Sequence, residues 1–263
     1  MIMKGRAISP GYAEGEAITY GEPFSFLGGV DGKTGKFNVR DGNIDGKVFL
    51  FPNGKGSTVG SYVVYDLMVQ GHAPAALVNR NAETIVTTGA VISSVPMVDG
   101  IDISLVRDGD IVAVDGNKGY VELKNVKEVN ITSAVIVVDK KFLILHRPSR
   151  SRSYPDKWSF VSGHVEYGES FEETSRREIM EETQISVSYP DAECPMFRVR
   201  EGDTIYNVHT FLYTLPSAEV KLNDENTEYK WISLEEVDLS KMVDGVSVAL
   251  EAFKQFLRLS GRV

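Results

Sequence analysis

The stretch from Gly163 to Ile185 constrains this chain more than any other, because it holds seven glutamates and two arginines. Ser170, followed three positions later by Glu173, has the pattern of a capping box, which predicts that a helix begins there. The glutamates are too many for an ordinary solvated helix. The stretch therefore indicates a functional site built on a helix.

Three of the glutamates, Glu178, Glu181 and Glu182, are expected to share one helix face. At 100° per residue they fall within an arc of roughly 100°. Carboxylates this close repel one another unless a cation lies between them, and an all-oxygen ligand set favours Mg²⁺ or Mn²⁺. Arg177 is four residues from both Glu173 and Glu181 and can pair with either.

This stretch resembles the Nudix box, the signature of the Nudix hydrolases. The positions that match are Gly163, Glu169, Arg177, Glu178, Ile179, Glu181, Glu182 and Ile185. The resemblance implies an α/β/α sandwich that cleaves a nucleoside diphosphate derivative with a divalent cation and an activated water. Gln184 departs from the pattern, because the family has glycine there. The helix is therefore expected either to run further or to end with strain.

The resemblance also implies a role for each acidic or basic position. Glu178, Glu181 and Glu182 become the metal ligands, with the carbonyl of Gly163 as a further ligand and Glu182 as the catalytic residue. Arg177 and Glu169 would orient the carboxylates rather than touch the substrate.

Several questions about this half stay open. Glu182, Glu225 or Glu228 could orient the attacking water, and Tyr154 and Trp158 could stack on a base or belong to the core. ADP-ribose, an oxidised nucleotide, a dinucleoside polyphosphate and an isoprenoid diphosphate are all candidate substrates. An alternative is that this half binds a nucleotide or metabolite without catalysis and acts as a sensor.

Composition excludes several classes of protein. The net charge of −9 argues against nucleic acid as a partner. No apolar run approaches the roughly 18 residues of a membrane span, and the first residues lack a signal-peptide core, so a cytoplasmic location is expected. The single cysteine, Cys194, excludes an internal disulfide and a self-contained cysteine-ligated cluster.

The order of patterns along the chain predicts two mixed α/β domains. Residues 1–126 read as short strands, turns and two helices, with a buried strand at Val48–Phe51. A short polar link follows, and the pattern restarts with a hairpin that opens a second domain over residues 131–263. The expected architecture is a swivelling β/β/α domain followed by a Nudix α/β/α sandwich.

A glycine-rich loop, PNGKGSTVGS at residues 52–61, joins the buried strand to a helix. Its glycines allow backbone N–H groups to converge, and the helix N-terminus favours anions. The loop is not a P-loop, because Gly56 follows Lys55 where that motif requires serine or threonine. Ser57 and Ser61 could face a ligand and Ser57 could act as a base, or both could simply cap the helix.

Residues 1–125 also resemble a known family, the small subunits of the aconitase X type, and among them those of archaeal phosphomevalonate dehydratases. The segments that carry the resemblance are KGRAISPGYAEGEAI, FSFLGGVD, FPNGKGSTVGSY, APAALV, AETIVTTGAVISSVPMVDG and DGDIVAVDG. It implies dehydration of (R)-mevalonate 5-phosphate to trans-anhydromevalonate 5-phosphate in an archaeal mevalonate pathway.

In that family the serine of the GKGS run is the proton acceptor, which corresponds to Ser57. Lys55, Gly56 and Ser61 would bind the substrate, although Lys55 could equally be solvated. The metal, an iron–sulfur cluster by resemblance, is expected on a separate large subunit, so this half should be inactive alone. A competing hypothesis is that the first half is a scaffold that only recruits a partner.

Overall fold

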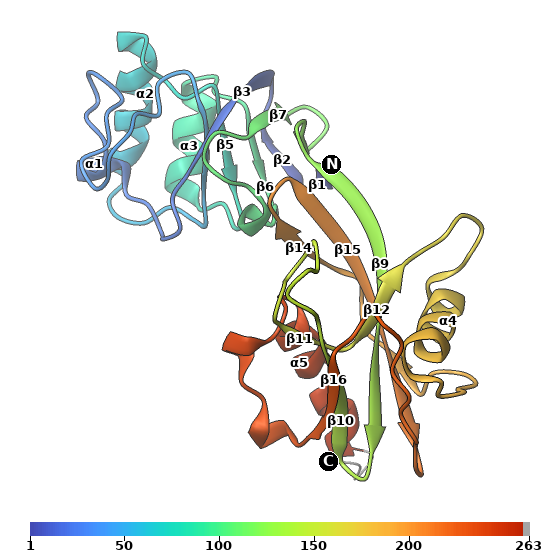
Figure 1. Ribbon diagram of the computed structural model, residues 1–263. Coiled ribbons are helices and arrows are strands. Elements are labelled where there is room, and N and C mark those ends of the chain that lie inside the picture. The colour runs from blue at the N-terminus through green and yellow to red at the C-terminus, as the bar shows by residue number, and fades with distance from the viewer. Residues whose placement is uncertain (260–263) are drawn as a thin grey trace. The chain divides into compact units, whose positions relative to one another are not determined.

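The computed structural model describes residues 1–259, and the chain divides into two compact units between Lys127 and Glu128. Each unit is mixed α/β and is built on its own eight-stranded sheet, so the expected fold class is confirmed (Figure 1). No helix among the described residues has the length and apolar character needed to cross a bilayer.

The sheet of the N-terminal unit has the strand order β1-β8-β7-β3-β4-β5-β6-β2. Its strands are β1 (Ile2–Lys4), β2 (Arg6–Ser9), β3 (Tyr12–Thr19), β4 (Val48–Phe51), β5 (Ala76–Asn79), β6 (Met97–Asp99), β7 (Ile111–Asp115) and β8 (Tyr120–Leu123). The four neighbours from β3 to β6 are parallel, whereas all other pairs are antiparallel.

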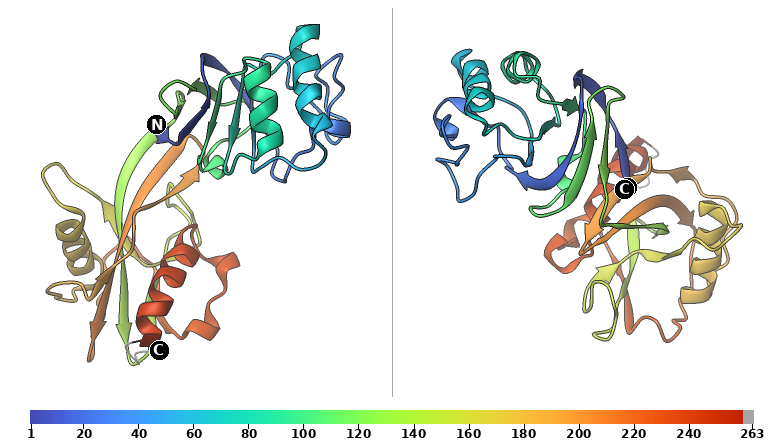
Figure 2. Two further views of the ribbon diagram at one scale, coloured as in Figure 1. Left: turned by 180° about the vertical axis from the view of Figure 1, so that it is seen from behind. Right: turned by 90° about the horizontal axis from the view of Figure 1, so that it is seen from above.

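Three helices accompany this sheet: α1 (Phe26–Gly29), α2 (Val59–Gln70) and α3 (Thr84–Ile92). α2 and α3 lie side by side on one face of it, as both views show (Figure 1, Figure 2). They approach closely because Gly89 of α3 has no side chain: a Cβ there would stand only 3.1 Å from Val64 of α2. α2 ends where expected, since Gly71 takes the left-handed φ of 79° that glycine adopts without strain.

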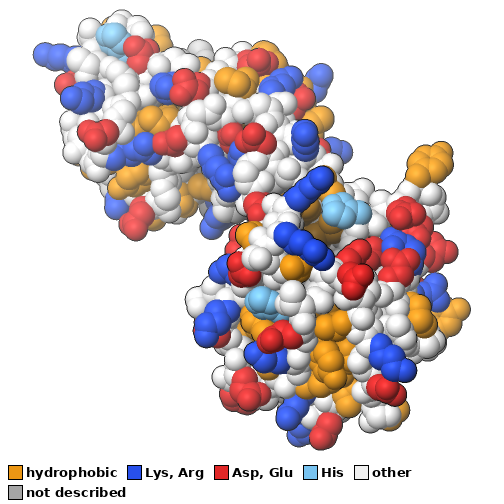
Figure 3. Space-filling view, in the orientation of Figure 1, with side chains coloured by type: hydrophobic (Ala, Val, Ile, Leu, Met, Phe, Trp, Pro, Cys, Tyr) orange, Lys and Arg blue, Asp and Glu red, His pale blue; other side chains and the backbone are white. Residues whose placement is uncertain are grey.

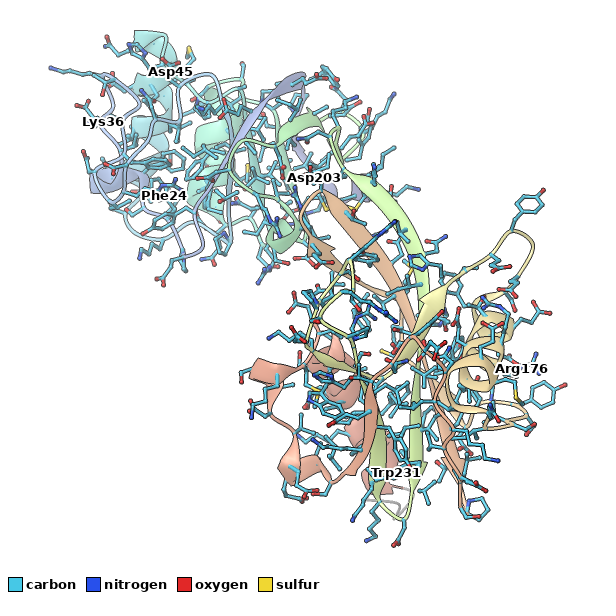
Figure 4. All side chains as sticks on the ribbon, viewed as in Figure 1. Phe24, Lys36, Asp45, Arg176, Asp203 and Trp231 are labelled. Atoms are coloured by element: carbon cyan, nitrogen blue, oxygen red, sulfur yellow. The ribbon has the colours of Figure 1, made fainter. Side chains whose placement is uncertain are left out.

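The core under these helices is aromatic. Phe24, labelled in Figure 4, makes edge-on contacts with Phe26, Phe37 and Phe49, and Phe49 stacks on Phe51. Such contacts add to the free energy gained by burying the rings. Because side chains alternate along a strand, Phe49 and Phe51 of β4 face the helices and the loop beyond them stays anchored to the core.

The sheet of the C-terminal unit runs β11-β10-β9-β15-β13, with β12 paired to β9, β14 to β15 and β16 to β10. The strands are β9 (Lys127–Val138), β10 (Lys141–His146), β11 (Trp158–Ser159), β12 (Val161–His164), β13 (Ala192–Glu193), β14 (Phe197–Glu201), β15 (Thr204–Leu215) and β16 (Glu228–Ile232). The expected opening hairpin is therefore β9 and β10, which pair antiparallel.

Two helices cover opposite faces of this sheet, α4 (Phe171–Thr183) and α5 (Val246–Leu259). Alternation along the strands separates two cores: Val135 and Val137 pack in the core that includes Phe253 of α5, whereas Ile136 packs in the core that includes Ile179 of α4. The unit is thus the expected α/β/α sandwich, and α4 is the glutamate-rich helix.

Candidate functional site

The helix α4 begins and ends as its sequence dictates. The capping box is present, since Ser170 Oγ accepts from the N–H of Glu173 at 3.2 Å and Glu173 Oε2 accepts from the N–H of Ser170 at 2.9 Å. At the other end Gln184 has a φ of 55°, in the left-handed region that disfavours a side chain. Replacing glycine at this position has therefore strained the helix exit rather than lengthened the helix.

Two of the three predicted ligands, Glu178 and Glu182, are buried at the inner face of α4. Burial, followed by the charges of Glu178 and Glu225, raises the pKa of Glu182 to about 8. Burial also raises the pKa of Glu178. Glu182 Oε2 accepts a hydrogen bond from Asn226 at 3.1 Å, which fixes the carboxylate toward the cleft.

Arg177 connects the remaining carboxylates. It forms a two-point pair with Glu169, with distances of 2.9 Å and 3.1 Å, and its Nη1 donates to Glu178 at 2.9 Å and to Glu181 at 3.0 Å. Of the two partners predicted four residues away, Arg177 therefore pairs with Glu181, while Glu173 is used in the capping box. The Arg177 hydrogen bonds, with one from Thr174, lower the pKa of Glu169 to about 2.

The neighbouring arginine has a different environment. Arg176, labelled in Figure 4, lies on the outer side of α4 and pairs with Glu172 at 3.6 Å. Figure 3 shows acidic side chains gathered with basic ones over α4 and the loop before it. Arg177 is thus the arginine that organises the carboxylates of the cleft.

Gly163, at the third position of β12, lies against the carboxylate of Glu178. There is no room for a methyl group on Gly163, because a Cβ would overlap the Glu178 carboxyl group. Glycine is needed here for close approach rather than for an unusual φ, which explains the residue type independently of any role for its carbonyl.

The acidic cleft is lined by Gly163, Glu166, Glu178, Glu181, Glu182 and Glu225, among other residues. Glu228, the other acid considered for positioning water, lies on β16 and pairs with Lys230 at 2.9 Å. Of the two later acids, Glu225 alone appears in the lining of the cleft.

The donor chemistry of the cleft suits a hard divalent cation, since buried like-charged carboxylates with raised pKa values gain from neutralisation. Within residues 1–259 no three metal-ligating side chains already converge as a ligand set. Arg177 donates to one oxygen of Glu178 and to the carboxylate of Glu181.

A largely apolar pocket adjoins the cleft and shares with it Ile131, Arg147, Ser153, Ser159, Ser162 and Tyr206. Thr210 lines this pocket, is fully buried, and its hydroxyl has no hydrogen-bond partner among the described residues. Tyr154 closes one side by donating to Asp244 at 3.0 Å. Burial and the Asp244 charge raise the pKa of Tyr154, so its hydroxyl stays protonated. Trp158 packs against the core of α5 instead.

The glycine-rich loop of the N-terminal unit precedes α2. Ser57 is exposed, and its Oγ accepts from the N–H of Val59 at 3.3 Å, beside the helix N-terminus. Lys55 and Gly56 are also exposed, and Gly56 has a φ of 106°. Ser61 differs, because it is buried and donates to the carbonyl of Thr58 at 2.9 Å. Among the serines of this loop, Ser57 is therefore the accessible one.

Sequence reasoning overlooked Glu83, the N-cap residue of α3, which supports this loop. Its carboxylate accepts from the N–H groups of Ile85 and Val86, both at 2.7 Å, and lies against Gly54 with no space for a Cβ. The signal was Gly54 itself, since a glycine in a tight loop often marks a close neighbour. Thr210 and Asp244 were also overlooked, because nothing in their local sequence marks a pocket.

The two-unit fold agrees with the family models that match this chain. Residues 2–123 match the aconitase X swivel domain, and residues 129–253 match the NUDIX domain. The phosphomevalonate dehydratase small subunit of Thermococcus onnurineus is 52% identical over 129 residues, covering 47% of this chain and 99% of that protein. Through its N-terminal unit the chain therefore belongs to the family of phosphomevalonate dehydratase small subunits. A NUDIX domain follows that unit in the sequence.

Solved structures resemble each half separately. Aconitase X from Thermococcus kodakaraensis is 50% identical, with 47% of this chain and 98% of that chain covered and a TM-score of 0.46. The MutT protein from Methanosarcina mazei is 27% identical, with 52% of this chain and 98% of that chain covered and a TM-score of 0.45.

Proposed function

We propose that this chain combines the small subunit of a phosphomevalonate dehydratase with a divalent-cation-dependent diphosphate hydrolase. The dehydratase would convert (R)-mevalonate 5-phosphate to trans-anhydromevalonate 5-phosphate together with a separate large subunit. The sequence identity of 52% between the first unit and a phosphomevalonate dehydratase small subunit supports the first activity. The buried carboxylates Glu178 and Glu182, held beside Arg177, support the second.

In the dehydration, the α C–H bond of the substrate would break, its proton would pass to the Ser57 alkoxide and its electron pair would form the Cα=Cβ double bond. The C–O bond at the β-carbon would break with loss of hydroxide, which takes up the proton held by Ser57 to become water. Ser57 suits the first task because it is exposed beside the N-terminus of α2, where backbone N–H groups stabilise an alkoxide. Lys55 and Gly56, exposed on the same loop, would bind the phosphate or carboxylate of the substrate. An iron–sulfur cluster on the large subunit would supply the Lewis acid for the leaving hydroxyl.

The test for Ser57 is substitution in the reconstituted two-subunit enzyme. Ser57→Ala should abolish dehydration, whereas Ser61→Ala, which removes a buried hydroxyl bonded to Thr58, should leave the base in place. Dehydration by Ser57→Ala at the wild-type rate would remove the assignment and favour the scaffold hypothesis.

In the second unit, Glu178, Glu181 and Glu182 would hold Mg²⁺ or Mn²⁺, with the Gly163 carbonyl as a further ligand. The cation would supply charge neutralisation for the diphosphate and activation of a water. Arg177 and Glu169 hold the carboxylates in place, and Glu182 or Glu225 would orient the attacking water.

The apolar pocket beside the cleft suits the group attached to the diphosphate. The unpartnered hydroxyl of Thr210 favours a ring that carries hydrogen-bonding groups over an isoprenoid chain, because an alkyl chain would leave that hydroxyl unsatisfied. A nucleoside diphosphate derivative is therefore the preferred substrate class.

The hydrolase is tested by incubating the full chain and Mg²⁺ with nucleotides and isoprenoid diphosphates and measuring released products. Turnover of a nucleotide that Glu182→Gln reduces by orders of magnitude supports the proposal. Tight nucleotide binding without turnover would instead support the sensor.

A further inference from the structure

Four large apolar or aromatic side chains are exposed on the outer face of α2, which is unusual for a helix on the surface of a unit. Val59, Tyr62, Tyr65 and Val69 are 47%, 68%, 42% and 58% exposed. At 100° per residue these side chains span an arc of roughly 120°. Asp66, the only charged residue in the helix, is exposed and falls within the same arc, between Tyr62 and Val59. We call these four residues, together with Leu27, the α2 face.

The inner side of the same helix is apolar as well, because Val64 and Leu67 are fully buried in the aromatic core. A helix that is hydrophobic on both sides is normally covered on both. Contiguous exposed apolar side chains, and tyrosines in particular, are characteristic of protein–protein contacts. The exposed side chains of α2 therefore favour a partner for its outer face.

The α2 face is continuous with the Ser57 loop. Val59 follows Ser57 by two positions, and the segment before α1 lies beside the loop, since Lys55 N–H donates to the Phe24 carbonyl at 2.9 Å. A Cβ on Gly56 would stand 2.8 Å from Ser25 Oγ. The next exposed residue of that segment, Leu27, is 47% exposed. Exposed apolar side chains thus flank the serine on both segments.

Ser57 itself is exposed, although a serine that removes a proton from carbon needs a site that excludes water. The one cysteine of the chain, Cys194, lies in the other unit, so this unit has no cysteine for a cluster. A partner subunit that completes the site must therefore approach the Ser57 loop. The surface with exposed apolar side chains that adjoins this loop is the α2 face.

We propose that the α2 face is the surface on which the cluster-bearing large subunit of the dehydratase docks. The proposal rests on the dehydratase function proposed above and deepens it, because it says which residues bring the two halves of the active site together. Tyr62, the most exposed of the set, would be a central contact, because buried tyrosines often dominate the affinity of an interface.

The test uses the full chain and the dehydratase large subunit from the same host, with their affinity measured by biolayer interferometry. Tyr62→Ser should weaken binding by about tenfold or more, and Tyr62→Ser with Val69→Ser should weaken it further. Tyr12→Ser is the matched control, because Tyr12 is a 56% exposed tyrosine on β3 and not on α2. Circular dichroism verifies that the variants remain folded.

Three outcomes overturn the proposal: wild-type affinity in the double variant, an equal loss in Tyr12→Ser, or a dimer of the chain alone that Tyr62→Ser dissociates. The last result would assign the α2 face to a second copy. Assembly is read separately from turnover, so Ser57→Ala should bind the large subunit with wild-type affinity. Activity in Ser57→Ala would remove the proposed base but leave the docking result intact.

Discussion

The backbone of Gly163 and the carboxylate of Glu178 lie in direct contact, with no space between them for a methyl group. This contact fixes one buried carboxylate of the cleft from the strand side, while Arg177 fixes it from the helix side at 2.9 Å. The position of Glu178 therefore depends on two residues that themselves carry no negative charge.

Gly163→Ala should displace Glu178 and weaken both cation binding and hydrolysis by at least about tenfold, since catalytic groups tolerate little misplacement. The measurement is the Mg²⁺ dependence of nucleotide hydrolysis. Gly21→Ala is the control, because a Cβ on Gly21 meets nothing within 4 Å. An unchanged Mg²⁺ dependence in Gly163→Ala would show that Glu178 is not needed where it lies.

Gln184→Gly should stabilise the C-terminal unit by about 0.5–1 kcal/mol, because glycine adopts the left-handed backbone at lower cost but loses more entropy on folding. Gln184 has a φ of 55° and ends α4. Urea unfolding measures the free energy, with Gln184→Ala as the control that keeps a Cβ. A destabilised Gln184→Gly variant would mean that the glutamine side chain compensates for its strain.

Thr210→Val should raise stability and lower nucleotide affinity at the same time. The Thr210 hydroxyl is buried without a partner among the described residues, and its removal should stabilise the unit by about 1 kcal/mol. If a bound nucleoside uses that hydroxyl, its dissociation constant should rise. Calorimetry with a nucleoside monophosphate separates the two effects. An unchanged dissociation constant would show that the nucleobase binds away from Thr210.

Glu169 should contribute to stability in a defined pH range. Its pKa is lowered to about 2, chiefly by hydrogen bonds from Arg177 and Thr174. A lowered pKa means that the stabilisation is complete above the unfolded-state pKa of about 4.5 and is lost as the pH falls through about 2. Glu169→Gln should therefore destabilise the chain at pH 6 and make little difference near pH 2.

Thermal unfolding at a series of pH values measures this difference between Glu169→Gln and the wild type. Glu235→Gln is the control, because Glu235 is exposed on a distant turn of the same unit. A constant difference between Glu169→Gln and the wild type across the whole range would contradict the role given to the Arg177 pair.

The elements that could be predicted from sequence are those set by local rules. The capping box at Ser170, the left-handed Gly71 and the buried strand β4 follow from neighbouring residues, so their prediction was reliable. The spacing of Glu178 and Glu182 likewise placed both on one helix face, which the structure buries.

Long-range contacts could not be read in the same way. Glu83, the N-cap residue of α3, reaches Gly54 in the loop before α2, and Asn226 reaches Glu182 from a distant loop. The pairing of Arg177 with Glu169 depends on how the loop before α4 folds back. None of these partners follows from sequence spacing, because tertiary packing decides which side chains meet. The sequence placed Glu178 and Glu181 on one helix face, but it did not predict that Arg177 donates to both of them.

The most direct test of the cation site in the acidic cleft is a titration of the full chain with Mn²⁺, followed by electron paramagnetic resonance. The wild type and Glu228→Gln should bind the same number of ions, whereas Glu178→Gln combined with Glu182→Gln should lose the cleft ion. Equal Mn²⁺ binding by the double variant and the wild type would contradict the assignment of these carboxylates.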